Sequence, residues 1–461
     1  MKRELIKNTI IVAIGKFSTQ IISFLLLPLY TSILTTSEYG IYDFLITVAV
    51  FLVPMITLLL EESMFRFLID ADSDEDKRKI ISHATVFSLI STVIWSLIIF
   101  IILFLIDYEY NLIFVLYLIF CIIMSLANSI SRGLSKLKLY SISNFICSVV
   151  TLVLNVLFIA GFRWGINGLL LSTILANGVT SLFVILKLKV YKFISFKNID
   201  KKFLKEMVKY SIPLVPNNIS WTIINLSDRL FITGILGSSA NGIYSIANKF
   251  PNVMNTLYGF FYTAWKESAS KALKVEEHNA YYNSIYKAVR NFLFAVSLGL
   301  IVIMPFAFKV LINEAYNEAL LYIPILVIAV YYGNLSGFYG GLFVAFKDTK
   351  TLGISTIAGA IINILVNILL INSIGIYAAA ISTLVSNYLV NEYRKIKVRK
   401  FVSISYKEHL VTDFIMMMAV CVVFYYNNFI LNIISLFFTC LYCLYINKDV
   451  FRVLLRSFKR S

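Results

Sequence analysis

Several charged side chains lie within or beside long apolar stretches of this sequence, where charge is unusual. The basic ones are Lys16, Arg229 and Lys249, and the acidic ones are Asp43, Glu61, Glu62 and Asp228. Ionisable groups in apolar surroundings face a cavity or a partner and mark the paths of ions and substrates. Basic groups there attract phosphates. The carboxylates are candidates for coupling to a proton or sodium gradient.

Polar residues near one of these charges recur at helical spacing. Positions i, i+3, i+7 and i+11 share one helical face, and they hold Asn218, Trp221, Asn225 and Arg229. Subtracting 202 from the first three gives Lys16, Thr19 and Ser23. Two such stripes suit a water-filled cavity, and they equally suit hydrogen bonds between packed helices. For Asp228 and Arg229, mutual stabilisation of adjacent opposite charges is a further alternative.

The residues that could hold a metal ion or act in catalysis form no cluster. All five cysteines lie in apolar runs, and the Cys440-x-x-Cys443 pair has no second pair or histidine beside it. The three histidines, His83, His278 and His409, are far apart in the sequence. We therefore expect no catalytic residue, no metal site and no bound cofactor, and we do not expect an enzyme.

The apolar stretches dominate the composition. Hydrophobic residues make up 59% of the 461 residues and charged residues 14%, whereas soluble domains carry about 25% charged residues. Backbone polar groups in a bilayer must bond within the chain, so such stretches predict helices. We expect an all-α membrane protein with about fourteen transmembrane helices, near residues 8–34, 40–62, 82–106, 111–131, 139–161, 166–187, 210–236, 241–265, 282–308, 318–346, 351–372, 374–393, 410–427 and 428–446.

Lysine and arginine are distributed unevenly over the connections between these helices. With the N-terminus inside, the inside connections and the helix ends beside them hold 36 basic residues, and the outside connections hold only Arg163 and Lys309. This bias predicts a multi-pass protein of the cell inner membrane with both termini cytoplasmic. The net charge of +16 is then a topology signal, with membrane lipids rather than nucleic acid as its partner.

The two halves of the chain resemble each other. Residues 33–42 match residues 235–244 at six of ten positions, and GINGLLLSTILAN (165–177) parallels GIYAAAISTLVSN (375–387). The matches keep their order, which predicts two six-helix lobes related by a parallel repeat. We expect an N-terminal lobe at 1–190, a basic cytoplasmic linker at 191–209, a C-terminal lobe at 210–395, and two further helices with a basic tail at 396–461.

The segments FLLLPLYTSILTTSEYGIYDF (24–44) and SDRLFITGILGSSANGIYSIANK (227–249) give the chain a resemblance to a known family. It resembles the polysaccharide flippases of the multidrug/oligosaccharidyl-lipid/polysaccharide exporter superfamily. The resemblance implies that an undecaprenyl-pyrophosphate-linked oligosaccharide moves from the inner to the outer leaflet by alternating access, for surface polysaccharide biosynthesis. It also implies a polysaccharide polymerase and glycosyltransferases as partners. In that account Lys16, Arg229 and Lys249 bind pyrophosphate, while Asn218, Asn225 and Trp221 contact sugar.

Two other functions compete with this one. A cation-coupled multidrug exporter of the same superfamily transports mostly cations, which a cavity with more basic than acidic groups suits poorly. A membrane polysaccharide polymerase or ligase usually carries a sizeable external loop, whereas all the outside connections predicted here are short.

Overall fold

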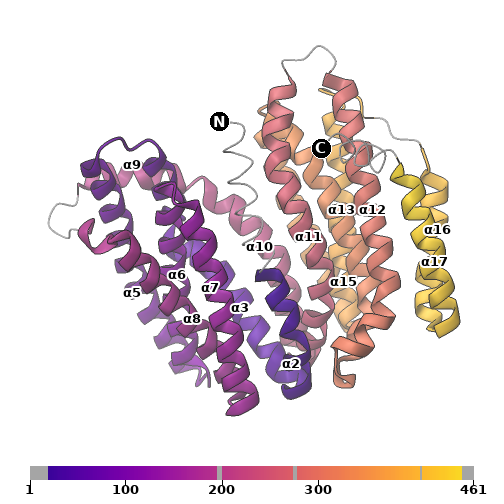
Figure 1. Cartoon of the computed structure of the whole chain (residues 1–461), viewed down its shortest axis with the longest axis horizontal. Coiled ribbons are helices and arrows are strands. Elements are labelled where there is room, and N and C mark those ends of the chain that lie inside the picture. Colours follow the sequence, from indigo (N-terminus) through magenta and orange to yellow (C-terminus); the bar gives the residue numbers. More distant parts are fainter. Residues whose placement is uncertain (1–18, 195–199, 274–277, 405–407, 449–461) are drawn as a thin grey trace, which may run out of the picture. The chain divides into compact units, whose positions relative to one another are not determined.

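The computed structural model of the chain describes residues 19–194, 200–273, 278–404 and 408–448. Within these ranges the regular elements are all helices, and no strand occurs (Figure 1). Nine of the described helices are long and apolar enough to cross a membrane, and two shorter apolar helices span Thr19–Ile33 and Leu410–Tyr426. The expected all-α membrane fold is confirmed. The count of fourteen spans stays a prediction.

The chain divides between Leu226 and Ser227 into two compact units, called here unit 1 and unit 2. The main helices of unit 1 are α2 (Leu27–Ile33), α3 (Thr36–Thr57), α4 (Leu60–Ile69), α5 (Asp74–Leu105), α6 (Asn111–Gly133), α7 (Leu137–Asn155), α8 (Gly165–Leu188) and α9 (Lys201–Ser211). Helix α10 (Leu214–Phe231) contains the division. Unit 2 continues with α11 (Ser238–Ala272), α12 (His278–Leu311), α13 (Ala319–Ala345), α14 (Thr349–Ile374), α15 (Ile376–Val398), α16 (Leu410–Tyr426) and α17 (Phe429–Ile446). The lobe bounds derived from the repeat stay a prediction.

The span expected at 40–62 is not one continuous helix. Helix α3 ends at Thr57 and α4 begins at Leu60, while Leu58 and Leu59 have φ angles of 52° and 53°. Two features favour the break. Pro54 cannot donate to the carbonyl of Val50 and so weakens the last turns of α3, and the Thr57 hydroxyl accepts the Leu59 N–H at 3.2 Å. The apolar sequence hid this break, which places the carboxylates that follow it on a separate short helix.

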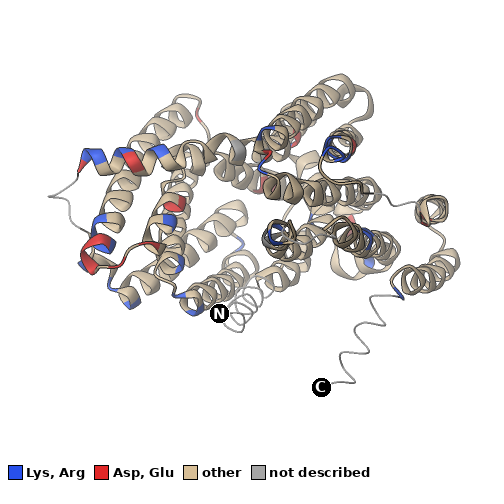
Figure 2. Ribbon diagram, turned by 90° about the horizontal axis from the view of Figure 1, so that it is seen from above, with Lys and Arg blue, Asp and Glu red and all other residues tan. Residues whose placement is uncertain are grey.

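Helix α9 begins within the segment predicted as the basic linker and packs against other helices of unit 1. Its inward positions Phe203, Leu204, Met207 and Val208 join a core formed with α4, α5 and α6, in which Met207 is fully buried. Its outward positions carry lysines, so the helix is amphipathic. In Figure 2, which looks down on the molecule, basic residues colour this helix and helix ends beside it.

The core of unit 2 depends on close approach of α11 and α13. The indole of Trp265 stacks on Phe338 with ring centroids 4.4 Å apart and donates to the Phe338 carbonyl at 3.0 Å. A Cβ added at Gly341 would lie 2.5 Å from the Trp265 Cδ1 atom. Glycine at this position therefore allows the indole to fit between the helices, as small residues do in membrane bundles.

Candidate functional site

The carboxylate of Asp228 is buried inside unit 2, with 2% of the residue exposed. It lies near the end of α10 and is reached by α11 and α15. The Tyr244 hydroxyl donates to Oδ2 at 2.8 Å, and the Thr383 hydroxyl donates to the same oxygen at 2.7 Å. Oδ2 is thus held by hydroxyl donors from two different helices.

The other carboxylate oxygen is held mainly from α14. Asn363 and Asn367 donate to Asp228 Oδ1 at 3.1 and 2.8 Å, and their spacing of four residues puts them on one face of the helix. The Ser382 hydroxyl of α15 adds a contact at 3.3 Å. Ser227 also donates to Asn363 Oδ1 at 2.7 Å, which ties α10 to α14. We call Asp228 with its five donors the Asp228 cage.

Burying a carboxylate away from water is expensive unless it is hydrogen-bonded or paired. Five donors from three helices satisfy Asp228, and none of these five is a basic side chain. Every donor is a neutral hydroxyl or amide, so the donors themselves supply no positive charge to balance an ionised carboxylate. One monovalent cation would balance the single negative charge of an ionised Asp228 among these neutral donors.

The cage is also chemically suited to a cation, because each of its donors has a second role. Hydroxyl oxygens both donate and accept, and an amide presents its oxygen in place of its nitrogen by rotating half a turn. In the present arrangement Asn367 Oδ1 is buried and has no hydrogen-bond partner among the described residues. Oxygens of carboxylates, amides and hydroxyls are the ligands that hard cations prefer. The residues therefore fit either a proton or a sodium ion on Asp228.

The repeat-related position in unit 1 has no such carboxylate. At the repeat offset of 202, Asp228 corresponds to Leu26, which is buried with 4% exposed. At the later offset of 210, Ser382 corresponds to Ser172, whose hydroxyl donates to the Gly168 carbonyl at 2.7 Å. The carboxylate is thus not needed to build this kind of helical unit, which favours a function specific to unit 2.

The three basic residues predicted to bind the substrate lie in different surroundings. The guanidinium of Arg229 lies 5.8 Å from the Tyr244 ring centroid, so Tyr244 contacts both neighbouring charges, Asp228 through its hydroxyl and Arg229 through its face. Tyr244 thus links the two adjacent charges, and both their mutual stabilisation and a substrate role for Arg229 stay predictions. Lys249 is half-buried in α11. Lys16 lies outside the described residues.

The polar stripe of α10 is helical, as its spacing predicted. Asn218 and Asn225 are both exposed. The side chain of Trp221 lies outside what the structure describes. Because the division between the units falls within α10, a role for this stripe in lining a cavity stays a prediction.

The carboxylates predicted in unit 1 lie on two helices, Asp43 on α3 and the adjacent Glu61 and Glu62 on α4, and they differ in their surroundings. Asp43 is half-buried in α3. Glu61 is 5% exposed, and its Oε2 has no hydrogen-bond partner among the described residues. Glu62 forms an ion pair with Arg132 of α6 at 2.9 Å. Glu62 is therefore tied to α6 by a partly exposed ion pair, whereas Glu61 is buried, and the roles of both in ion coupling stay predictions.

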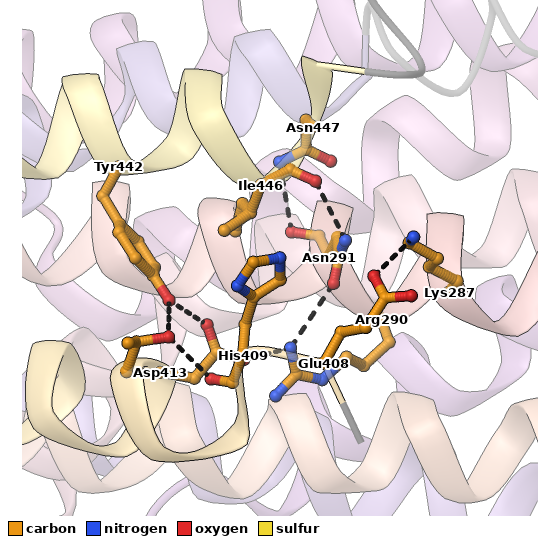
Figure 3. Close-up of polar contacts among 10 residues, drawn as sticks. Lys287, Arg290, Asn291, Glu408, His409, Asp413, Tyr442, Ile446 and Asn447 are labelled. Carbon is orange, nitrogen blue, oxygen red and sulfur yellow. Dashed lines mark hydrogen bonds and ion pairs between the residues drawn. The ribbon is translucent and has the colours of Figure 1, made fainter. Parts of the chain in front are cut away.

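A buried ion pair in unit 2 was missed by the sequence analysis. Arg290 was counted with a basic inside connection, yet it lies within α12 and pairs with Asp413 of α16 (Figure 3). Their side chains are 7% and 3% exposed. Tyr442 of α17 donates to Asp413 at 2.6 Å, and Asn291 donates to the Ile446 carbonyl at 2.9 Å. These contacts attach the last two helices to α12.

Few signals in the sequence could have identified these groups. The serine and threonine of the cage, Ser382 and Thr383, stand in the repeated GIYAAAISTLVSN segment. Asn363 and Asn367 form an i, i+4 pair in the apolar middle of a helix, which is a pattern that a closer search could have used. The pairing of Arg290 with Asp413 joins helices far apart in the sequence and left no local pattern.

Comparison with known proteins shows the family of the chain, and solved structures show its fold. The sequence pattern of a family described as polysaccharide biosynthesis protein matches residues 5–266. An uncharacterized membrane protein of Methanocaldococcus jannaschii is 24% identical over 432 residues, which cover 87% of this chain and all of the relative. Among solved structures, the lipid II flippase MurJ in an inward closed conformation has a TM-score of 0.76 at 16% identity, covering 97% of this chain and 100% of its own. An inward-facing multidrug resistance MATE family transporter of the MOP superfamily has a TM-score of 0.67 at 16% identity, covering 84% and 97%.

Proposed function

The chain belongs to the polysaccharide biosynthesis protein family, and from that premise we propose that it is a membrane flippase for a lipid-linked glycan. The substrate we propose is an undecaprenyl-pyrophosphate-linked oligosaccharide, moved from the inner to the outer leaflet by alternating access. The observation that supports this most directly is the family match together with a fold shared with a lipid II flippase over the length of the chain. Glycosyltransferases would supply the substrate and a polymerase would use the product.

We further propose that a cation on Asp228 drives the cycle. A site couples to transport when its occupancy favours one conformation over another. The cage joins α10, α11, α14 and α15 through a single carboxylate, so neutralising that charge changes the hydrogen bonds of four helices together. Protonation and sodium binding both remove the net charge, and both therefore fit this role.

The anionic head group calls for basic residues. In the proposal Lys16, Arg229 and Lys249 attract the pyrophosphate, and Asn218, Asn225 and Trp221 contact the sugars. Arg229 lies one residue from the cage and shares Tyr244 with it. Cation binding at Asp228 would thus be felt at a residue proposed to hold the substrate. The motion itself would be a rocking of the two lobes.

A second candidate is a cation-coupled multidrug exporter, which the likeness to MATE transporters favours. A cationic drug would be repelled by Arg229 and Lys249, whereas a pyrophosphate would be attracted, because charges interact strongly where water is scarce. The lipid-linked glycan is therefore the substrate we favour.

The test uses the purified full chain in phospholipid vesicles that contain a fluorescent undecaprenyl-pyrophosphate oligosaccharide. We expect protein-dependent flipping of this lipid, measured by capture of the transferred oligosaccharide with an external lectin, and no uptake of ethidium by the same vesicles. Ethidium transport without glycan flipping would replace the proposal with the exporter. Glycan polymerised or ligated in the vesicles would indicate the enzyme.

A further inference from the structure

Two adjoining cavities of unit 1 follow helix α5 and share His83 in their walls. The polar one has a volume of about 780 Å³ and is lined by Asp74, Glu75, Arg78, Lys79, Ser82, His83, Lys192 and Phe193. The apolar one has a volume of about 250 Å³ and is lined by His83, Val86, Phe87, Ile90, Ser91, Ile94, Trp95 and Leu204. Together they form a groove, called here the α5 groove, that is charged at one end and apolar along the rest.

The charges at the polar end leave a net positive charge. Asp74 pairs with Lys77 at 2.9 Å, and Lys79 pairs with Asp200 at 3.3 Å. Among the lining residues this leaves the cations of Arg78 and Lys192 and the carboxylate of Glu75, none of which forms an ion pair with a described residue. Two positive charges and one negative charge leave a balance of plus one, which matches a single phosphodiester.

Helix α9 packs beside α5 and contributes to the wall of the apolar cavity. The Asp200 N–H donates to His83 Nε2 at 2.7 Å, while His83 Nδ1 lies 2.6 Å from the Lys79 carbonyl. Phe203 packs edge-on against His83 at 5.3 Å between centroids. Leu204, one position further along α9, lines the apolar cavity. The groove is therefore enclosed by two elements far apart in sequence and is not simply the outer face of one helix.

The dimensions of the apolar part fit one lipid chain. From His83 to Trp95 the helix rises about 18 Å at 1.5 Å per residue. One leaflet of a bilayer contributes about 15 Å of hydrocarbon. Ile90, Ile94 and Trp95 are 55%, 52% and 46% exposed along this length, and they present an apolar surface to a chain. A polyprenol tail is several times longer than the groove.

We propose that the α5 groove is a binding site for an anionic glycerophospholipid. The phosphodiester binds between Arg78 and Lys192, and one acyl chain lies along Ile90, Ile94 and Trp95. This end of unit 1 is the one that the distribution of basic residues predicts to be cytoplasmic, and anionic lipids are enriched in that leaflet. The site lies within unit 1, apart from the Asp228 cage, and does not depend on the proposed glycan substrate.

Trp95 provides the readout. The full chain is placed in phosphatidylcholine nanodiscs that contain increasing fractions of phosphatidylglycerol with brominated acyl chains, and tryptophan quenching is measured. The chain has four tryptophans, so the difference from a Trp95→Phe variant isolates the one in the groove. Brominated phosphatidylcholine serves as the reference lipid.

We expect phosphatidylglycerol to quench Trp95 at a much lower fraction than phosphatidylcholine, by about 25-fold if each of two cations contributes about fivefold. Arg78→Gln/Lys192→Gln abolishes this preference. The matched control Lys201→Gln/Lys205→Gln removes the same charge from exposed positions of α9 that line neither cavity, and it keeps the preference.

Equal quenching by the two lipids would mean annular contact only and would overturn the proposal. So would an equal loss of preference in the control variant, which would indicate a general surface charge. A second measurement needs no variant in the cation pair. Unbrominated phosphatidylglycerol should reverse the quenching of Trp95 in the wild-type chain, and failure to compete better than phosphatidylcholine would equally refute the site.

Discussion

The buried ion pair between Arg290 and Asp413 gives a prediction whose size follows from its surroundings. Both side chains are more than nine-tenths buried, so removing one partner leaves a charge with little access to water. Such a change costs about 3–5 kcal/mol. We expect Asp413→Leu and Arg290→Met each to lower the stability of unit 2 by this amount. Tyr442→Phe removes one hydrogen bond to a charged group and should cost less, about 1.5–3 kcal/mol.

The double variant Arg290→Met/Asp413→Leu separates an ion pair from two independent losses. Apolar replacement of a whole buried pair is often neutral, so the double variant should recover most of the stability that either single variant loses. Thermal unfolding of the purified chain in detergent, monitored by circular dichroism, gives the comparison. The reasoning is refuted if the single variants unfold at the wild-type temperature, or if the double variant is as unstable as the sum of both.

Two further predictions concern packing and pH. Gly341→Ala should destabilise the chain by about 1–3 kcal/mol, because the new Cβ would lie 2.5 Å from the buried Trp265 indole. The matched control is Gly353→Ala, whose Cβ would meet nothing within 4 Å. In the same thermal-unfolding assay this variant should stabilise α14 by up to about 1 kcal/mol. Equal effects of Gly341→Ala and Gly353→Ala on the stability would contradict the packing account. The second prediction concerns Asp200, which caps α9. Hydrogen bonds from the Lys202 N–H and then from the Lys79 ammonium lower the pKa of Asp200. The stabilisation that the Asp200 carboxylate gives to the docking of α9 is therefore complete above the pKa of Asp200 in the unfolded chain, about 4. It is lost as the pH falls through the lowered pKa of Asp200 in the folded chain. The protection of α9 amides against hydrogen exchange, relative to their intrinsic rates at each pH, should fall below that pH in the wild-type chain. Asp200→Asn should remove this pH dependence, and an unaltered pH response in Asp200→Asn would exclude this carboxylate as the cause.

The membrane fold could be predicted because its signals are local. A helix such as α6 is apolar over most of its length, and a bilayer allows few other structures for such a segment. The break after Thr57 was missed for the same reason. Leu58 and Leu59 are as apolar as their neighbours, and only Pro54 hints that the helix ends there.

The candidate site could be predicted only in part, because its contacts are not local. Asp228 was identified as an ionisable residue in an apolar stretch. Its partners lie 16 residues away in the case of Tyr244 and 155 in the case of Thr383. For Arg290 the prediction from sequence was wrong in a different way. Its position near a basic connection suggested a topology signal, and its burial against Asp413 depends on how α12 and α16 pack.

The most direct test of cation-driven flipping is the initial rate of glycan flipping in vesicles with and without an imposed sodium or proton gradient. With wild-type protein one of the two gradients should increase the rate, and Asp228→Asn should abolish that increase and lower flipping by roughly tenfold. Asp348→Asn, a carboxylate paired with Lys400 outside the apolar segments, is the matched control and should respond like wild type. Flipping by Asp228→Asn that still follows the gradient as in the wild type would contradict the role of the Asp228 cage.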